Sequence, residues 1–419
     1  MGIKFFKCLI IFALLIALPM VLIACGEPAE EEVIDDVEEV VDEEVTEEEA
    51  NGIDPDLDPV LIGCLIPFTG VETHNGLSMQ YGAEIAAEMI NANGGINGRE
   101  VQLILEDTTG SASVAEDRAI RMVEDDNVDV LIGTLASSET YAVFEYAQEQ
   151  EIIFMNPTFY TGELHGRYFF ATGATPNQVI YPLMDYALEE LDKNSYYFIG
   201  SDYVWGYGSI AAALGHGEEI GAEVVNEEYV PFGTTDFSSN ITRIMGSDAD
   251  IIFPFVAGLD GATFLQQLYD FGATQDYLIV GNYLDELLVP ALPAGAVEGI
   301  VNTSGYYTNI DTPENAAFLE KVREYDSDAL MGNFGANMYH NLLFYAEAAN
   351  AAGTTETEAV IEALQGLTIQ GLTGPMTIDP ETQHAIQNIY MAEIQPDKSF
   401  EIIKVLEQVV PLVEEGLTQ

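Results

Sequence analysis

Short apolar runs alternate with helical segments from residue 60 onward, and this alternation constrains the fold more than any other feature of the sequence. Within 76–92, Leu77, Tyr81 and Ile85 recur every four residues, the spacing of one helix face. Strands that are apolar throughout and are followed by helices predict parallel sheets covered on both faces, so the expected fold class is α/β. The predicted strands are 60–66, 100–106, 128–133, 152–155, 195–199, 223–229, 249–255, 277–280, 375–379 and 388–394. The predicted helices are 76–92, 113–125, 138–149, 178–191, 207–220, 237–246, 260–271, 313–325 and 334–352.

Eight of these strands lie between residues 60 and 280, which is more than one sheet of this kind comfortably holds. The polar, proline-containing segment 171–178 interrupts the alternation halfway, and a second break follows at 295–305. We therefore expect two α/β lobes joined by several crossings. The cleft between such lobes lies beside the carboxyl ends of the strands, where open α/β sheets bind ligands.

The N-terminal 25 residues have the pattern of a secretory signal peptide. Lys4 and Lys7 precede an apolar run at 8–23, and small residues follow it. An uncleaved membrane anchor is the alternative, but the run is short for a full span and Pro19 interrupts it. The ending Leu-Ile-Ala-Cys resembles a bacterial lipoprotein box, which implies that Cys25 carries a lipid and holds the mature protein outside the cytoplasmic membrane.

Carboxylates dominate the charge of the chain, with 71 Asp and Glu against 12 Lys and Arg and a net charge of −59. Because phosphate binding needs clustered Lys and Arg, this balance argues against a nucleic-acid partner. Seventeen of the acidic side chains lie in 27–58 without one basic residue, so we expect 26–58 to be an extended, disordered tether. The globular part keeps 54 acidic and ten basic residues, a net charge of −44.

The sequence lacks the motifs of several enzyme classes. It has no Gly-x-Ser-x-Gly elbow, no phosphate-binding loop with Gly-Lys, and no Gly-x-Gly-x-x-Gly after a strand. Its five histidines lie far apart, without the spacing of a zinc site. Cys8 leaves with the signal peptide, so Cys64 has no partner for an internal disulfide and is expected to be a small buried apolar residue. We expect no metal, no cofactor and no catalysis.

Several segments, weak one by one but specific in their order and spacing, resemble the periplasmic solute-binding proteins of ABC importers, in the leucine/isoleucine/valine-binding branch. They are Ile-Gly-x-x-Ile-Pro-x-Thr-Gly at 62–70, Ile-Asn-x-x-Gly-Gly-Ile-x-Gly-Arg at 90–99, Glu-Asp at 106–107, Val-Asp-Val-Leu-Ile-Gly-x-x-Ala-Ser-Ser at 128–138, Gly-Ser-Asp-Tyr-Val-Trp-Gly at 200–206 and Thr-Asp-Phe at 235–237. The resemblance spans about residues 60–405. Stretches at 160–163, 172–178, 200–204 and 379–384 look closer to the urea- and short-chain-amide-binding members.

The resemblance implies two Rossmann-like lobes of the type I periplasmic binding fold, joined by three hinge crossovers. We place lobe I at 59–175 plus 303–390 and lobe II at 176–302 plus 391–419. The resemblance also implies a receptor that captures a small amino acid of the branched-chain type, or a short-chain amide or urea, by closure about the hinge. The implied partners are this ligand, the permease subunits of an ABC importer, and the membrane through the lipid anchor.

The resemblance assigns ligand contacts in lobe I to two loops. In this family the loop after the third strand supplies a serine hydroxyl and backbone N–H groups; Ser137 matches that position and Ser138 is its neighbour. The pair could also cap the helix that begins near 138, and the two roles are compatible because a helix N-terminus binds carboxylates. By family position Thr158 and Tyr160 face the cleft, although a packed aromatic is an equal reading of Tyr160. Asn75 stands where an aromatic is often found.

In lobe II the resemblance points to Tyr203, Trp205 and Asp260. Trp205 is the single tryptophan, so closure is expected to change its fluorescence, unless it is a core residue. Asp260 stands where amino-acid binders carry an acid for the α-ammonium group, whereas urea binders lack a dependable one. It could equally be a helix-start residue that interacts with the helix dipole. If it binds the ammonium group, Asp260→Asn abolishes amino-acid binding and spares urea.

Two other functions remain open on the sequence. A sensory module that passes ligand binding to a signalling partner would share the fold, and adjacent genes would distinguish it from a transport protein. An extracytoplasmic hydrolase with a carboxylate dyad is the other alternative, and turnover of a candidate solute would reveal it.

Overall fold

A computed structural model describes residues 52–70, 72–414 and 416–417 of the chain. The predicted signal peptide, Cys25 and most of the acidic tether lie outside these residues. The end of the tether differs from the expectation, because Asp54 N donates to Gly98 O at 2.8 Å and Arg99 Nε donates to Asp58 O at 2.7 Å. Residues 52–58 are therefore attached to the globular part. Within the described residues, no helix has the length and apolar character needed to span a membrane.

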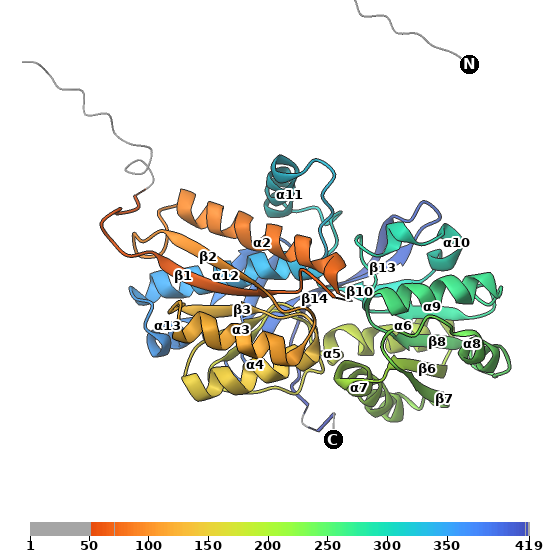
Figure 1. Ribbon diagram of the computed structural model, residues 1–419. Helices are drawn as coiled ribbons and strands as arrows, with labels where there is room; N and C mark the ends of the chain where they lie inside the picture. The colour runs from red at the N-terminus through yellow and green to blue at the C-terminus, as the bar shows by residue number, and fades with distance from the viewer. Residues whose placement is uncertain (1–51, 71, 415, 418–419) are drawn as a thin grey trace, which may run out of the picture. The chain divides into compact units, whose positions relative to one another are not determined.

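The first sheet is parallel throughout and has the strand order β2-β1-β3-β4-β5. Side chains alternate along β1: Ile62 and Cys64 enter one buried cluster with helices α2 and α12, whereas Leu65 enters another with α3 and α4. Figure 1 shows these two helix pairs on opposite faces of the sheet. Cys64 is fully buried and free, as predicted. The elements are β1 (Val60–Ile66), α2 (Thr73–Ala92), β2 (Val101–Asp107), α3 (Ala112–Glu124), β3 (Val130–Gly133), α4 (Ser137–Gln150), β4 (Phe154–Asn156), β5 (Phe169–Ala171) and α12 (Asn333–Ala352).

The second sheet is mixed, with the order β11-β12-β13-β10-β9-β8-β6-β7 and with β14 paired to β13. Its strands β6 to β10 are parallel, and Tyr197 and Ile199 of β6 face helices α8 and α9 while Tyr196 and Phe198 face α6 and α7. The elements up to β10 are α5 (Pro176–Val179), α6 (Tyr181–Leu191), β6 (Ser195–Ser201), α7 (Val204–Ile220), β7 (Glu223–Val230), α8 (Ser238–Met245), β8 (Ile251–Phe255), α9 (Gly258–Asp270), β9 (Leu278–Gly281), η1 (Val289–Ala291), α10 (Ala294–Val297) and β10 (Val301–Ser304).

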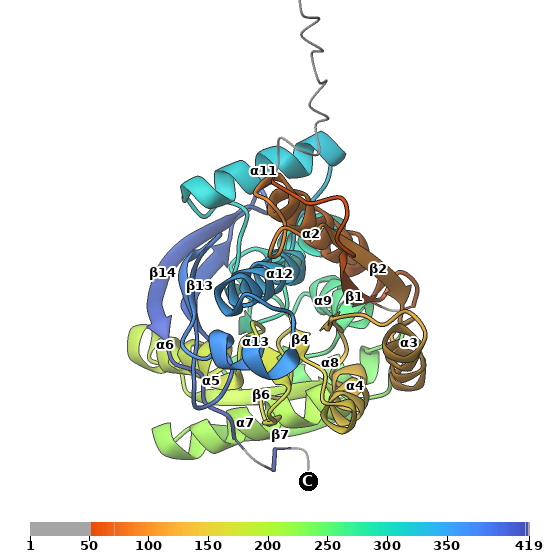
Figure 2. The same cartoon turned by 90° about the vertical axis from the view of Figure 1, so that its left-hand side faces the viewer.

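The C-terminal part of the chain adds antiparallel strands to this second sheet, which corrects the expectation of purely parallel sheets. Figure 2 shows the two long strands β13 and β14 side by side. The sequence pattern did not reveal β5, β10, β11, β14, η1, α10 and α13, and it joined α5 and α6 into one helix. The remaining elements are α11 (Pro313–Tyr325), α13 (Thr357–Leu364), β11 (Thr368–Gly371), β12 (Gly374–Ile378), β13 (Ala385–Ile394) and β14 (Phe400–Val409).

The chain passes between the two sheets three times, so the fold is two Rossmann-like lobes joined by three crossovers. It leaves the first sheet after β5, returns after β10 to helices α11 to α13, and enters the second sheet again through β11 to β13. Hydrogen bonds hold the crossovers together: Gln387 Nε2 donates to Thr172 O at 2.9 Å, and Gln178 Nε2 donates to Ala385 O at 3.0 Å. The residue at which each lobe begins and ends stays a prediction.

Glycines bring α2 and α12 close together against the first sheet. A Cβ at Gly82 would lie 2.0 Å from the carbonyl oxygen of Gly335, which is far inside van der Waals contact. This close approach positions the first turns of both helices, which carry Glu72, Asn75 and Phe334, at the carboxyl ends of the strands.

Candidate ligand-binding site

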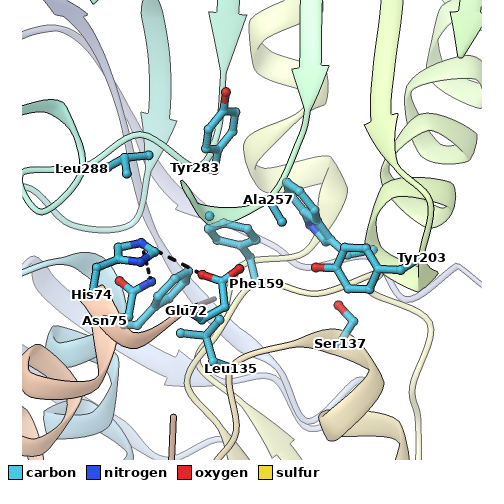
Figure 3. A pocket seen from close by; sticks show the side chains of 13 residues that line it. Glu72, His74, Asn75, Leu135, Ser137, Phe159, Tyr203, Ala257, Tyr283 and Leu288 are labelled. Atoms are coloured by element: carbon cyan, nitrogen blue, oxygen red, sulfur yellow. Dashed lines mark hydrogen bonds and ion pairs between the residues drawn. The ribbon is translucent and has the colours of Figure 1, made fainter. Parts of the chain in front are cut away.

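A cavity of about 450 Å³ lies at the carboxyl ends of the parallel strands of both lobes. Its walls come from the segments that follow β1, β3, β4, β6, β8 and β9 and from the first turn of α12. This is the position expected for a ligand site in open α/β sheets. The lining residues are Glu72, His74, Asn75, Leu135, Ser137, Phe159, Tyr203, Trp205, Ala257, Gly258, Tyr283, Leu288 and Phe334 (Figure 3).

Three polar side chains at the start of α2 form one wall of the cavity. Asn75 Nδ2 lies 3.0 Å from His74 Nε2, and His74 Nε2 lies 4.0 Å from Glu72 Oε2. Burial lowers the pKa of His74 to about 4, so the ring is neutral at pH 7. Burial, followed by repulsion from Glu139, Asp260 and Asp285, raises the pKa of Glu72 to about 7.

The Glu72 carboxylate reaches across the cleft to the opposite lobe. Its side chain is 9% exposed, and a Cβ at Gly258, the first residue of α9, would lie 2.8 Å from Glu72 Oε1. Gly258 also has a φ of +54°, a conformation that glycine adopts readily. The glycine therefore leaves room for the carboxylate at the start of α9, and Glu72 forms part of the contact between the lobes.

The start of α4 contributes Ser137 and the first backbone N–H groups of the helix. These groups have no partner within the helix, and the helix dipole makes them favourable for an anionic or carbonyl oxygen. Glu139 stabilises this turn, because its Oε2 accepts hydrogen bonds from Ala136 N at 2.9 Å and from Leu135 N at 3.2 Å. Burial raises the pKa of Glu139, which is completely buried.

Aromatic side chains from both lobes form the remaining wall. The rings of Phe159 in the first lobe and Trp205 in the second have centroids 5.8 Å apart, and Phe159 and Phe334 lie 5.0 Å apart. Tyr203 and Tyr283 each lie 6.4 Å from Trp205. Contacts at these distances are ordinary for aromatic clusters, so the two lobes meet through a continuous aromatic surface.

The structure brings together part of the predicted site. Ser137, Tyr203 and Trp205 line the cavity, as does Asn75. Trp205 is 3% exposed, so the alternative reading of a buried tryptophan is compatible with its place in the wall. Ser138 is the second residue of α4 and does not line the cavity.

Thr158, Tyr160 and Asp260 also lie outside the cavity lining. The Thr158 hydroxyl donates to Leu135 O at 3.2 Å, and the Tyr160 hydroxyl lies 2.7 Å from His384 Nε2 in the core of the first lobe. Asp260 sits in the first turn of α9, where its Oδ2 accepts from Gly233 N at 2.7 Å. A ligand contact by any of the three stays a prediction, and the hydrogen bonds show what each side chain does in this structure.

Sequence reasoning missed Glu72, His74, Phe159, Tyr283 and Phe334. Phe159 and Tyr283 follow closely on predicted strands and Phe334 begins a predicted helix, so the position of these three at the carboxyl ends of the strands was the available signal. Glu72 was hidden because carboxylates occur throughout this chain.

A family model described as "Periplasmic binding protein" matches residues 59–399, which include both lobes and the whole cavity lining. The chain belongs to the periplasmic binding protein family. It is a solute-binding protein of the ABC-transporter type, and this family works outside the cytoplasm and binds solutes.

Relatives of this periplasmic binding protein agree with the assignment. Leu/Ile/Val-binding protein homolog 6 of Brucella melitensis is 26% identical over 347 residues, which are 80% of this chain and 88% of that protein. The structure is similar to an ABC transporter substrate-binding protein from Sphaerobacter thermophilus, with a TM-score of 0.77, 26% identity, and coverage of 85% of this chain and 100% of that one. A solute-binding protein from Rhodopseudomonas palustris, solved with 3,4-dihydroxybenzoic acid, has the same fold, with a TM-score of 0.77, 20% identity, and coverage of 85% and 99%.

The described part of this binding protein contains no group of three or more His, Cys, Asp or Glu side chains placed to hold a metal ion. The cavity offers a solute hydrogen-bonding groups and an aromatic wall. Such a site can desolvate a small solute between the lobes, where each unmatched polar group weakens the binding of a wrong ligand.

Proposed function

We propose that this binding protein captures a small amino acid between its two lobes and delivers it to the permease of an ABC importer. The observation that carries the proposal is the division of the cavity wall into an oxygen-binding side and an apolar side. The start of α4 with Ser137 suits a carboxylate, and the aromatic cluster around Trp205 suits an apolar side chain. A short-chain amide or urea fits the first side only.

Closure about the three crossovers is the mechanism that the proposal requires. The cavity wall has parts from both lobes, so a ligand that touches both stabilises the closed arrangement over the open one. The permease then recognises the closed form. Lipid attachment at Cys25 and the acidic segment after it would keep the receptor at the outer face of the membrane.

An aromatic acid is a second candidate ligand, because the cavity wall is rich in aromatic rings and the Rhodopseudomonas palustris neighbour was solved with one. The described lining residues include no Lys or Arg to pair with its carboxylate. The Glu72 carboxylate would repel an anion that lies along the aromatic wall. The charge of the site therefore favours an amino acid.

A thermal-shift panel tests the proposal with leucine, isoleucine, valine, small polar amino acids, urea, acetamide, formamide and 4-hydroxybenzoate. A ligand at 100 times its Kd adds about 2.7 kcal/mol to the stability of the folded state, which is several degrees in melting temperature. We expect at least one amino acid to raise the melting temperature. A shift with urea or an amide alone, or with 4-hydroxybenzoate alone, would replace the proposed ligand class, and no shift with any solute would reject the proposal.

A further inference from the structure

We propose that Glu72 binds the ammonium group of the ligand, so that the cleft selects solutes with a positively charged nitrogen. This inference rests on the proposed function, because it concerns the same cavity. It differs from the expectation drawn from the family resemblance, which assigned the ammonium group to Asp260 on the other lobe.

The Glu72 carboxylate lies where a solute in the cavity can reach it. It lines the cavity, its side chain is 9% exposed, and Figure 3 shows it facing the hydroxyl of Tyr203 across the cavity. Asp260, by contrast, does not line the cavity and accepts a hydrogen bond from Gly233 N. Of the two acids, Glu72 is the one that a solute in the cavity can touch.

The second argument is the lack of a cation for this buried carboxylate. Its one ion-pair partner among the described residues is His74 at 4.0 Å, and burial lowers the pKa of that ring to about 4. The other acids nearby, Glu139 and Asp285, are themselves buried and add negative potential. A buried charge without a partner is costly, and an ammonium group placed beside it would remove that cost.

The third argument is independent of charge and comes from Asn75. This side chain is 3% exposed and lines the cavity, and its Nδ2 points to His74 Nε2. Its Oδ1 has no hydrogen-bond donor among the described residues. Within the described part of the chain, the same wall therefore holds an amide oxygen without a donor beside a carboxylate without a cation, and an ammonium group supplies three donors. A carboxylate or carbonyl oxygen oriented towards this wall supplies none.

Aromatic rings complete the environment of a cation. Tyr203, Trp205 and Tyr283 line the cavity around Glu72, and ring faces attract ammonium groups, most strongly where water is excluded. The start of α4 takes the opposite end of a zwitterion. A zwitterionic amino acid thus matches both ends of the cavity.

Calorimetry with the tightest amino acid of the panel tests the inference on the full protein, its Glu72→Gln variant and its Asp260→Asn variant. Glu72→Gln keeps the size of the side chain and removes the charge. Loss of a charged hydrogen bond predicts a weakening of about 10- to 100-fold. Asp260→Asn tests the competing assignment, because Asp260 does not line the cavity; a loss of affinity in this variant equal to that of Glu72→Gln would overturn the role of Glu72. We expect Asp260→Asn to change the affinity by less than about threefold, since the Asp260 charge acts only from a distance.

A ligand series on the wild-type protein gives a second readout that does not depend on any variant. The carboxylic acid that lacks the amino group should bind at least about 10-fold more weakly than the amino acid. Equal affinity of the two ligands, or an unchanged affinity of Glu72→Gln, would overturn the role of Glu72 while leaving the proposed function intact. Absence of binding by every amino acid to the wild-type protein would instead reject the proposed function, and the role of Glu72 with it.

Discussion

Replacement of Glu72 by glutamine is expected to stabilise the ligand-free protein at neutral and alkaline pH, although it weakens ligand binding. Glu72 is 7% exposed, and Glu139, Asp260 and Asp285 repel its carboxylate, so the ionised form is disfavoured in the folded state. Glutamine has nearly the same shape and no charge. The variant is therefore expected to bind the ligand more weakly and to have a higher free energy of unfolding, as expected when the unpaired charge of a binding site is removed.

The size of this effect follows from the pKa of Glu72, which rises from 4.5 to about 7 on folding. The folded state holds the proton of Glu72 more tightly than the unfolded chain does. The contribution of this carboxyl group to the stability of the folded state is therefore fully present below pH 4.5. It is lost as the pH rises through 7. A difference of this size corresponds to at most about 3 kcal/mol in the free energy of unfolding at pH 8.

Urea unfolding at pH 5, 6, 7 and 8 and constant salt measures the effect. Wild type and Glu72→Gln should have similar free energies of unfolding at pH 5 and diverge as the pH rises, with the variant more stable at pH 8. Asp285 and Glu286, whose pKa values burial raises to about 6 and about 7, keep part of the pH dependence in both proteins. Glu116→Gln, at an exposed site on α3, is the matched control and should follow the wild type. Parallel pH profiles of wild type and Glu72→Gln would refute the reasoning.

Three further predictions concern Trp205, Asp260 and the charge of the whole chain. Because Trp205 is the single tryptophan and lines the cavity, ligand binding should change its emission, and a spectrum unaffected by a saturating ligand would exclude it from the wall. Asp260→Asn should lower the melting temperature only slightly, because the exposed hydrogen bond from Gly233 N keeps an acceptor and loses only its charge, which is worth about 1 kcal/mol or less. A large drop in melting temperature would contradict this. Because salt screens the repulsion within the globular part, which has a net charge of −44, its melting temperature should rise between low and molar salt. Such a rise would indicate a protein suited to a salt-rich habitat, and an unchanged melting temperature would contradict this.

The pattern of apolar runs was sufficient for most of the fold because the central strands, such as β3, β6 and β8, are buried along their whole length, whereas β2 and β7 are only partly buried. All ten predicted strands are present, and along β1 Ile62 and Cys64 enter one buried cluster while Leu65 enters the other. The strand β14 was missed because charged residues interrupt its apolar run: Lys404 and Glu407 are exposed within it. Its strand structure depends on pairing with β13, which no local pattern reveals.

The candidate site was only partly predictable, for a different reason. Ser137, Tyr203 and Trp205 belong to short segments whose order along the chain could be compared with a family. Glu72 belongs to no such segment, and its significance comes from burial against Gly258, nearly 190 residues away in the sequence. Asp260 was a sensible expectation from position, but the nearby Gly233 N–H binds its carboxylate outside the cavity.

A crystal structure of the protein with the tightest solute of the panel tests the central claim most directly. The account predicts one solute between the lobes, with its carboxylate at Ser137 and the start of α4, its ammonium group at Glu72, and its side chain against Trp205. A solute bound outside this cavity, or one whose nitrogen lies away from Glu72, would contradict the account.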